Sequence, residues 1–155
     1  MPNLTAWAPR VLSLLRLVVA LLYMQHGLMK LFDFPAPQPG AADPLPPILF
    51  AAAWIEVAGG ALLAVGLFTR AAAFICSGQM AVAYFMVHFP KGLLPLQNRG
   101  EAAALFSFIF FYFAGNGAGR FSLDAMLRGR ASGRTRIPAP ISEAVDAWER
   151  DEPAA

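Results

Sequence analysis

Residues 11–32 read VLSLLRLVVALLYMQHGLMKLF, an almost unbroken apolar run that carries only two charged side chains, Arg16 and Lys30. A transmembrane helix needs about 20 mainly apolar residues to cross a hydrocarbon core of about 30 Å. The run is long enough for this, and a cluster of prolines between residues 35 and 39 ends it, because proline lacks an amide donor and clashes with the preceding turn. The stretch therefore predicts a transmembrane helix.

Three further apolar stretches follow, from about residue 47 to 68, from 70 to 89 and from 101 to 118. The chain of 155 residues is 57% hydrophobic and 14% charged, whereas soluble domains contain about 25% charged residues. This composition excludes a disordered chain, a disulfide-rich secreted scaffold and an ordinary soluble enzyme, and a net charge of +2 is too small to indicate a nucleic acid partner. We predict an all-α polytopic membrane protein with an antiparallel bundle of four transmembrane helices.

Basic residues are distributed unequally around these spans. One side carries Arg10, Arg16, Arg70, Arg120, Arg128, Arg130, Arg134 and Arg136, and the other carries Lys30, Lys91 and Arg99. Because Lys and Arg are enriched in cytoplasmic flanks, we expect a multi-pass protein of the bacterial inner membrane with both termini in the cytoplasm. The loops at residues 33–46 and 90–100 then face outward. We interpret Arg16 and Arg70, near the inner helix ends, as topology anchors that extend toward the headgroups.

The chain after the fourth span divides into two parts. Ser122 is placed to cap a short helix that has apolar residues along one side and arginines after it. This pattern predicts a cytoplasmic interfacial helix against anionic headgroups. We therefore expect a transmembrane domain over residues 1–128 and a weakly ordered cytoplasmic tail over residues 129–155, basic at first and then acidic.

Seven polar side chains are predicted to lie in the outer half of the bundle. A charged side chain inside a span costs about 2.5–3.5 kcal/mol on insertion scales, so each needs a reason. At 1.5 Å per residue, His26 lies about 9 Å below the outer end of the first helix, and Glu56 lies about 13 Å below the outer end of the second. We expect these side chains to meet in one interhelical pocket for a ligand or a proton relay: His26, Lys30, Glu56, Gln79, His88, Asn98 and Glu101.

Glu56 is the centre of this prediction. An unpaired carboxylate at its depth must be protonated or matched to a cation. His26 and Lys30, four residues apart on one stripe of the neighbouring helix, are the available partners. We therefore predict that Glu56 lies within direct or water-bridged hydrogen-bonding reach of His26, Lys30 or Gln79.

These residues also have simpler interpretations. Lys30 and His88 are typical of membrane interfaces, and Gln79 is typical of polar contacts between helices. Glu101 suits the positive end of the fourth helix dipole, with a cap from Asn98. For Glu56, the alternative to a functional site is an ion pair with a purely structural role.

Small residues accompany the polar side chains on three helices: Gly27, Gly59, Gly60 and Gly78. Such residues let neighbouring backbones approach closely, so we expect their faces to point into the bundle. The aromatic residues between positions 106 and 113 of the fourth span are predicted to face lipid, with a quinone-stacking surface as the alternative.

Several motifs, in order, resemble the DoxX family of small four-helix inner-membrane proteins. They are HGLMKLF at residues 26–32, EVAGG at 56–60 with GLFTR at 66–70, and MAVAYF at 80–85, followed by His88, Pro90, Asn98 and Glu101. The resemblance extends over about residues 10–128. It implies a four-helix membrane fold, and some members resemble the membrane subunit of a thiosulfate:quinone oxidoreductase, whereas others are associated with oxidative-stress complexes.

We therefore expect a membrane component of a quinone-linked or oxidative-stress redox system. Quinone carbonyls need hydrogen-bond donors and a proton carrier, roles that His26, Lys30 and His88 could fill with Glu56 as a proton relay. The sequence contains no haem, flavin or iron–sulfur motif. The chain has one cysteine, Cys76, and two histidines, so we assign no metal site and no catalytic residue. Electron transfer would therefore require a bound quinone or a partner subunit.

Two other functions remain open at this point. A small-molecule or proton-coupled transporter also needs a buried carboxylate beside a cation or histidine. A non-catalytic membrane scaffold or assembly factor needs neither. The expected partners are the lipid bilayer and either a redox partner subunit or a second copy of the chain.

Overall fold

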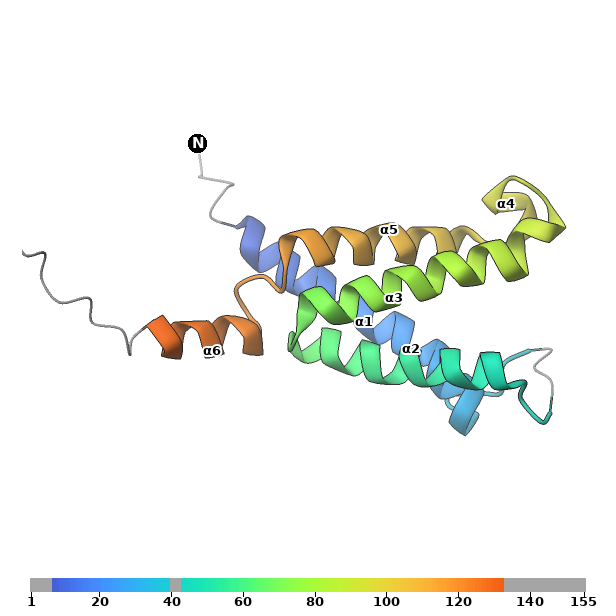
Figure 1. Cartoon of the computed structure of the whole chain (residues 1–155), viewed down its shortest axis with the longest axis horizontal. Helices are drawn as coiled ribbons and strands as arrows, with labels where there is room; N and C mark the ends of the chain where they lie inside the picture. The colour runs from blue at the N-terminus through green and yellow to red at the C-terminus, as the bar shows by residue number, and fades with distance from the viewer. Residues whose placement is uncertain (1–6, 40–42, 133–155) are drawn as a thin grey trace, which may run out of the picture. The chain divides into compact units, whose positions relative to one another are not determined.

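The structure is a computed structural model that describes residues 7–39 and 43–132. These residues form helices and contain no β-strand. The four longer helices are α1 (Ala8–Phe32), α2 (Pro47–Val65), α3 (Thr69–Ala83) and α5 (Glu101–Asn116) (Figure 1). The shorter elements are a π-helical turn η2 (Tyr84–His88), a 3-10 turn η3 (Phe89–Lys91), α4 (Pro95–Asn98) and α6 (Leu123–Ser132).

Local sequence explains where these helices begin and end. α2 begins at Pro47, where the missing amide of proline has no helical partner to lose. It ends at Gly66, whose left-handed φ of 71° is the usual conformation after a helix C-terminus. α1 ends in the same way at Asp33, with a φ of 52° and its N–H directed to the carbonyl of Leu28.

Three helices are long and apolar enough to cross a membrane: Ala8–Phe32, Pro47–Val65 and the continuous stretch Thr69–Lys91. α5, with 16 residues, is apolar but shorter. At 1.5 Å per residue it measures about 24 Å, which is less than the hydrocarbon core of about 30 Å. The chain is therefore a helical protein with membrane-spanning segments, and its fourth apolar helix is shorter than the sequence predicted.

The helices pack in pairs. α1 packs along α2 and α3 along α5, and α2 contacts α3 (Figure 1). The largest side chains buried between them are Tyr23, Leu63, Phe110 and Phe113. We call the end where α1 ends and α2 begins the Pro47 end, and the end with the α2–α3 turn the Gly66 end.

The aromatic residues of α5 are divided between the core and the surface. Phe110 and Phe113 are fully buried, whereas Phe108 and Phe111 are exposed. The prediction that these aromatic residues all face lipid was therefore wrong for Phe110 and Phe113. The reason is that α5 contacts α1 as well as α3, so that the ring of Phe110 packs edge-on against Tyr23.

The chain divides into two compact units, at residues 1–125 and 126–155. The predicted helix after the fourth span is present as α6, which begins in the first unit and continues into the second. Its membrane contact remains a prediction. The acidic tail and the arginines at 134 and 136 lie outside the described residues.

Candidate functional site

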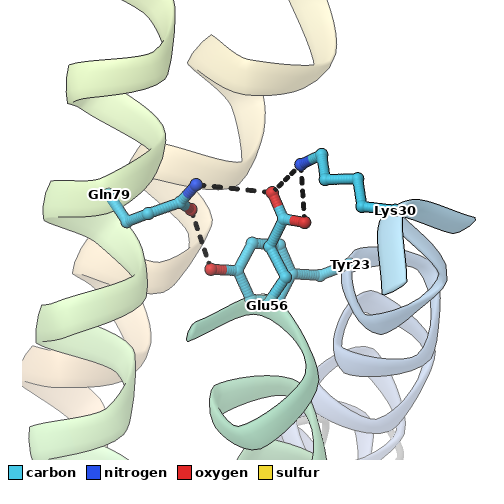
Figure 2. A network of polar contacts seen from close by, with 4 residues as sticks. All are labelled: Tyr23, Lys30, Glu56 and Gln79. Carbon is cyan, nitrogen blue, oxygen red and sulfur yellow. Dashed lines mark hydrogen bonds and ion pairs between the residues drawn. The ribbon is translucent and has the colours of Figure 1, made fainter. Parts of the chain in front are cut away.

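Four polar side chains from three helices form a continuous network, which we call the Glu56 network (Figure 2). The ammonium Nζ of Lys30 lies 2.6 Å from Oε1 and 2.7 Å from Oε2 of Glu56. The amide Nε2 of Gln79 donates to the same Oε1 at 3.3 Å. The hydroxyl of Tyr23 donates to Oε1 of Gln79 at 2.9 Å. The network thus runs from the core of α1 through α3 to the ion pair between α1 and α2.

Helical spacing on α1 aligns the two ends of this network. Tyr23, Gly27 and Lys30 are separated by four and three residues, so they share one face of the helix. A Cβ atom on Gly27 would come within 2.6 Å of the carbonyl oxygen of Ala53 and 2.9 Å of the Cβ of Glu56. Only glycine lets the two backbones approach this closely, and this approach brings the ammonium group to the carboxylate.

Gly60 and Gly78 differ in this respect. A Cβ on Gly60 would meet the Cβ of Met24 at 2.8 Å, in agreement with the predicted close packing. Gly78 is exposed and has no other atoms within 4 Å of its Cβ position, so the prediction of close packing there was wrong. Consecutive residues of an α-helix point about 100° apart, so Gly78 faces outward while the neighbouring Gln79 faces α2.

The Glu56 network is well shielded and its ion pair is electrically neutral. The side chains of Glu56 and Lys30 are 1% and 12% exposed. Because the hydroxyl of Tyr23 donates to the amide oxygen of Gln79, the amide nitrogen is left to face the carboxylate. The predicted contact of Glu56 with His26, Lys30 or Gln79 is thus present, to Lys30 and Gln79. The role of this site stays a prediction.

His26 lies outside this network. Its side chain is exposed, and its ring stands nearly perpendicular to that of Phe106 with the centroids 6.1 Å apart. The structure shows no hydrogen bond from His26 to Glu56 among the described residues. It precedes Gly27 by one residue, so it points to the edge of the α1–α2 contact instead of into it.

A second group of polar contacts surrounds His88, and we call its members Tyr84, His88, Gly92, Asn98 and Gly100 the His88 cluster. Nδ1 of His88 lies 3.1 Å from the backbone carbonyl oxygen of Asn98. The side chain of Asn98 donates to the carbonyl of Gly92 at 2.7 Å and accepts from the amide of Gly100 at 2.8 Å. Its Nδ2 also lies 3.4 Å from the hydroxyl of Tyr84.

This geometry changes the interpretation of two predicted residues. Asn98 does not cap α5, because the N-cap position belongs to Gly100 and has no side-chain hydrogen bond. Glu101 is exposed in the first turn of α5, where the helix dipole favours a negative charge. In the part of the chain that the structure describes, no hydrogen bond or ion pair joins His26 or Glu101 to either group, so five of the seven predicted residues form two groups instead of one pocket.

The sequence profile of the DoxX family matches residues 11–89, which is half of the chain. This chain belongs to the DoxX family. An uncharacterized protein of Haemophilus influenzae is 45% identical over 128 residues, which cover 80% of this chain and 96% of that protein. No solved structure matches the chain. The DoxX match contains the entire Glu56 network and His88, and it ends before Asn98.

Arg16 of this DoxX protein has a different role from the predicted one. Its side chain is 2% exposed. Nε donates to the carbonyl of Ala118 at 2.9 Å, one terminal nitrogen donates to Leu63 and to Ala64, and the other donates to Phe121 at 2.8 Å. The interpretation of Arg16 as an anchor that reaches the headgroups was therefore wrong. Two of these carbonyls lie in the last turn of α2, where carbonyls lack regular intrahelical partners, and the other two lie in the segment after α5.

Asp124 completes this arrangement at the Gly66 end. Its two carboxylate oxygens accept the backbone amides of Phe68 and Thr69, each at 2.9 Å, and its own amide donates to the carbonyl of Gly66. We call Arg16, Asp124 and their backbone partners the Arg16 clamp. One feature of the sequence is consistent with this role of Asp124: Phe68, the residue before α3, has no polar side chain that could cap the helix.

Proposed function

We propose that this DoxX protein is a membrane component of a quinone-linked redox system and that the Glu56 network contacts the quinone. The observation that carries the proposal is the Lys30–Glu56 ion pair, buried between two mainly apolar helices. Ionisable residues inside spans are expensive and usually functional. Some other DoxX members resemble the membrane subunit of a thiosulfate:quinone oxidoreductase, and this resemblance suggests the ligand class.

The donor chemistry of the network fits a carbonyl ligand. The ammonium group of Lys30 has three N–H donors, and the two oxygens of Glu56 accept two of them. The third donor is available to a ligand carbonyl, and Glu56 can exchange a proton with the ammonium. A bound quinone would supply the electron-accepting chemistry, and its electrons would come from a reductant or a partner subunit.

We also propose the arrangement in the membrane. Three helices have the length to span, and α5 would complete a fourth crossing with local thinning of the bilayer or with help from flanking residues. With both termini in the cytoplasm of a bacterium, the Pro47 end lies on the outer side of the inner membrane. The Glu56 network would then meet quinone from the outer half of the bilayer.

A binding titration tests this proposal. The full chain in phosphatidylcholine nanodiscs is titrated with decylubiquinone, and binding is followed by quenching of tryptophan fluorescence. We expect saturable binding that Glu56→Gln weakens at least about tenfold, which corresponds to about 1.4 kcal/mol. Glu101→Gln makes the same chemical change at an exposed position of the Pro47 end and should leave the affinity unchanged.

Two results would contradict the proposal. One is the absence of saturable quinone binding by the wild-type protein. The other is an equal effect of Glu56→Gln and Glu101→Gln on the dissociation constant. Uptake of a solute into proteoliposomes that is lost in Glu56→Gln, without quinone binding, would favour the transporter instead.

A further inference from the structure

The imidazole ring of His88 is held by one nitrogen, and its other nitrogen has no partner among the described residues. Nδ1 lies 3.1 Å from the carbonyl oxygen of Asn98. A carbonyl oxygen only accepts hydrogen bonds, so the neutral ring must carry its proton on Nδ1. Nε2 is then a bare hydrogen-bond acceptor on a half-buried side chain.

The group that orients His88 is itself fixed. Asn98 is 2% exposed, and its side chain is held at both ends by backbone groups of Gly92 and Gly100. Within the cluster, Gly100 packs closely against two other members, since a Cβ there would lie 2.8 Å from the Cβ of His88 and 2.8 Å from a ring carbon of Tyr84. A histidine that donates one ring N–H to a fixed carbonyl presents its second nitrogen in a defined direction, as in sites where histidine binds a ligand.

The backbone at His88 is unusual as well. Residues Tyr84–His88 form a π-helical turn between α3 and η3. Such turns are rare and occur frequently at functional sites. This observation is independent of the side-chain hydrogen bonds, and the turn ends at His88.

The chemistry of Nε2 selects the class of ligand. A bare acceptor requires a donor, so a hydroxyl group fits, whereas a quinone carbonyl or an anion does not. The ring of Tyr84 lies nearly parallel to the imidazole, at 25° with the centroids 6.4 Å apart, and Phe85 and Phe89 in the same segment are exposed. These aromatic side chains provide apolar surroundings for a flat ring.

We propose that His88 is a second binding site, in which Nε2 accepts a hydrogen bond from an aromatic hydroxyl compound of the hydroquinone class. The inference rests on the proposed function, because a hydroquinone is the reduced form of the ligand assigned to the Glu56 network. The two sites are complementary: Lys30 donates to a carbonyl and His88 accepts from a hydroxyl. A hydroxyl on a lipid headgroup has the same donor chemistry, and the test separates the two sources.

The composition of the chain makes this site directly observable, because His26 and His88 are its two histidines. We propose to label them with ¹⁵N in the full chain, in phosphatidylcholine nanodiscs at about pH 8.5, above the range in which imidazole usually gains a proton. His88→Phe assigns the signals. Before any ligand is added, the His88 ring should show a proton on Nδ1 and none on Nε2.

The ligand is tested with a matched pair of probes. Tert-butylhydroquinone, added under argon, should move the Nε2 signal of His88 saturably and leave His26 unchanged. Its dimethyl ether has the same ring without a hydroxyl donor and should move neither signal. Replacing part of the phosphatidylcholine by phosphatidylglycerol tests a lipid hydroxyl.

Three results would overturn the proposal: a proton on Nε2 of His88 in the free protein, equal shifts at both histidines, or a shift with phosphatidylglycerol but none with the hydroquinone. The readout is independent of the quinone titration at the Glu56 network. A saturable shift at His88 in a protein that binds no decylubiquinone would support this site and remove the proposed function. Quinone binding with no response at His88 would do the reverse.

Discussion

At the scale of single residues, Glu56 shows how a charge is tolerated between apolar helices. Both of its carboxylate oxygens face the ammonium group of Lys30, and Gln79 donates to one of them. Removing two charges from water costs free energy that their attraction repays only in good geometry with further hydrogen bonds. Loss of one partner should therefore destabilise the protein more than loss of both.

This asymmetry gives a stability prediction. We expect Glu56→Ala to lower the free energy of unfolding by about 3 kcal/mol, because the ammonium of Lys30 is left without its counter-charge. The double variant Glu56→Leu with Lys30→Met should lie closer to the wild type, since apolar replacement of a buried pair is often neutral. Unfolding in mixed detergent micelles, followed by circular dichroism, measures both.

Glu101→Ala is the control for this comparison, since it removes an exposed glutamate at the Pro47 end. It should change the free energy of unfolding by less than about 0.5 kcal/mol. A double variant that is less stable than Glu56→Ala would contradict the account of the ion pair.

At the scale of elements, the Arg16 clamp joins parts of the chain that are not adjacent in the sequence. Arg16 on α1 donates to carbonyls at the C-terminal end of α2 and in the segment after α5. Asp124 in that segment accepts the first amides of α3. The clamp thereby gives hydrogen-bond partners to backbone groups at two helix ends, the C-terminal end of α2 and the start of α3, and in the segment after α5.

We expect Arg16→Met to lower the free energy of unfolding by more than about 3 kcal/mol, because several buried carbonyls lose their donor at about 1–3 kcal/mol each. Arg16→Lys should lie between Arg16→Met and the wild type, since an ammonium group cannot reproduce the planar fork of donors. Thermal unfolding in detergent measures these effects.

Arg70→Met is the matched control for the clamp. Arg70 lies near the same Gly66 end, but its side chain is exposed and makes one hydrogen bond, to the carbonyl of Ala114 at 3.2 Å. Its replacement should cost less than about 1 kcal/mol. Equal losses of stability for Arg16→Met and Arg70→Met would show that the clamp does not hold the helix ends together.

At the scale of the whole molecule, most of the apolar surface of the long helices is not covered by protein. In the most apolar 18-residue stretch of each helix, 33% of the residues of α1 and 28% of those of α2 are buried. Large exposed side chains such as Leu14, Phe74 and Phe108 lie along this surface. Lipid chains are the natural cover for it, because apolar surface of this extent is rare on soluble monomers.

The distribution of basic residues leads to a prediction of topology. We expect single cysteines introduced at Ala36 and Leu96 to react with a membrane-impermeant maleimide in intact cells, and one at Arg128 to react only after the membrane is opened. All three positions are exposed in the structure. Cys76 is buried, and replacing it by alanine removes its background. Labelling at Arg128 in intact cells would contradict the predicted orientation.

The sequence by itself determined the features that depend on neighbouring residues. Apolar length and prolines placed the long helices, because hydrophobic coverage and the missing amide of proline act locally. Depth along the helix axis also predicted that Glu56 would meet His26, Lys30 or Gln79, since a buried carboxylate needs a partner at its own level. The structure selected Lys30 and Gln79 from these three. The motifs around these residues were sufficient to recognise the DoxX family.

Only the tertiary structure decided which helix faces turn toward one another. The acceptors of Arg16 lie 47 to 105 residues away along the chain, so no local pattern could identify them. In the same way, packing of α5 against both α1 and α3 buried Phe110, and His88 contacts the backbone of Asn98 instead of the Glu56 network. Rotation of a helix about its axis leaves its hydrophobic length unchanged but exchanges all of its contacts, and for this reason the partners of these side chains follow from packing alone.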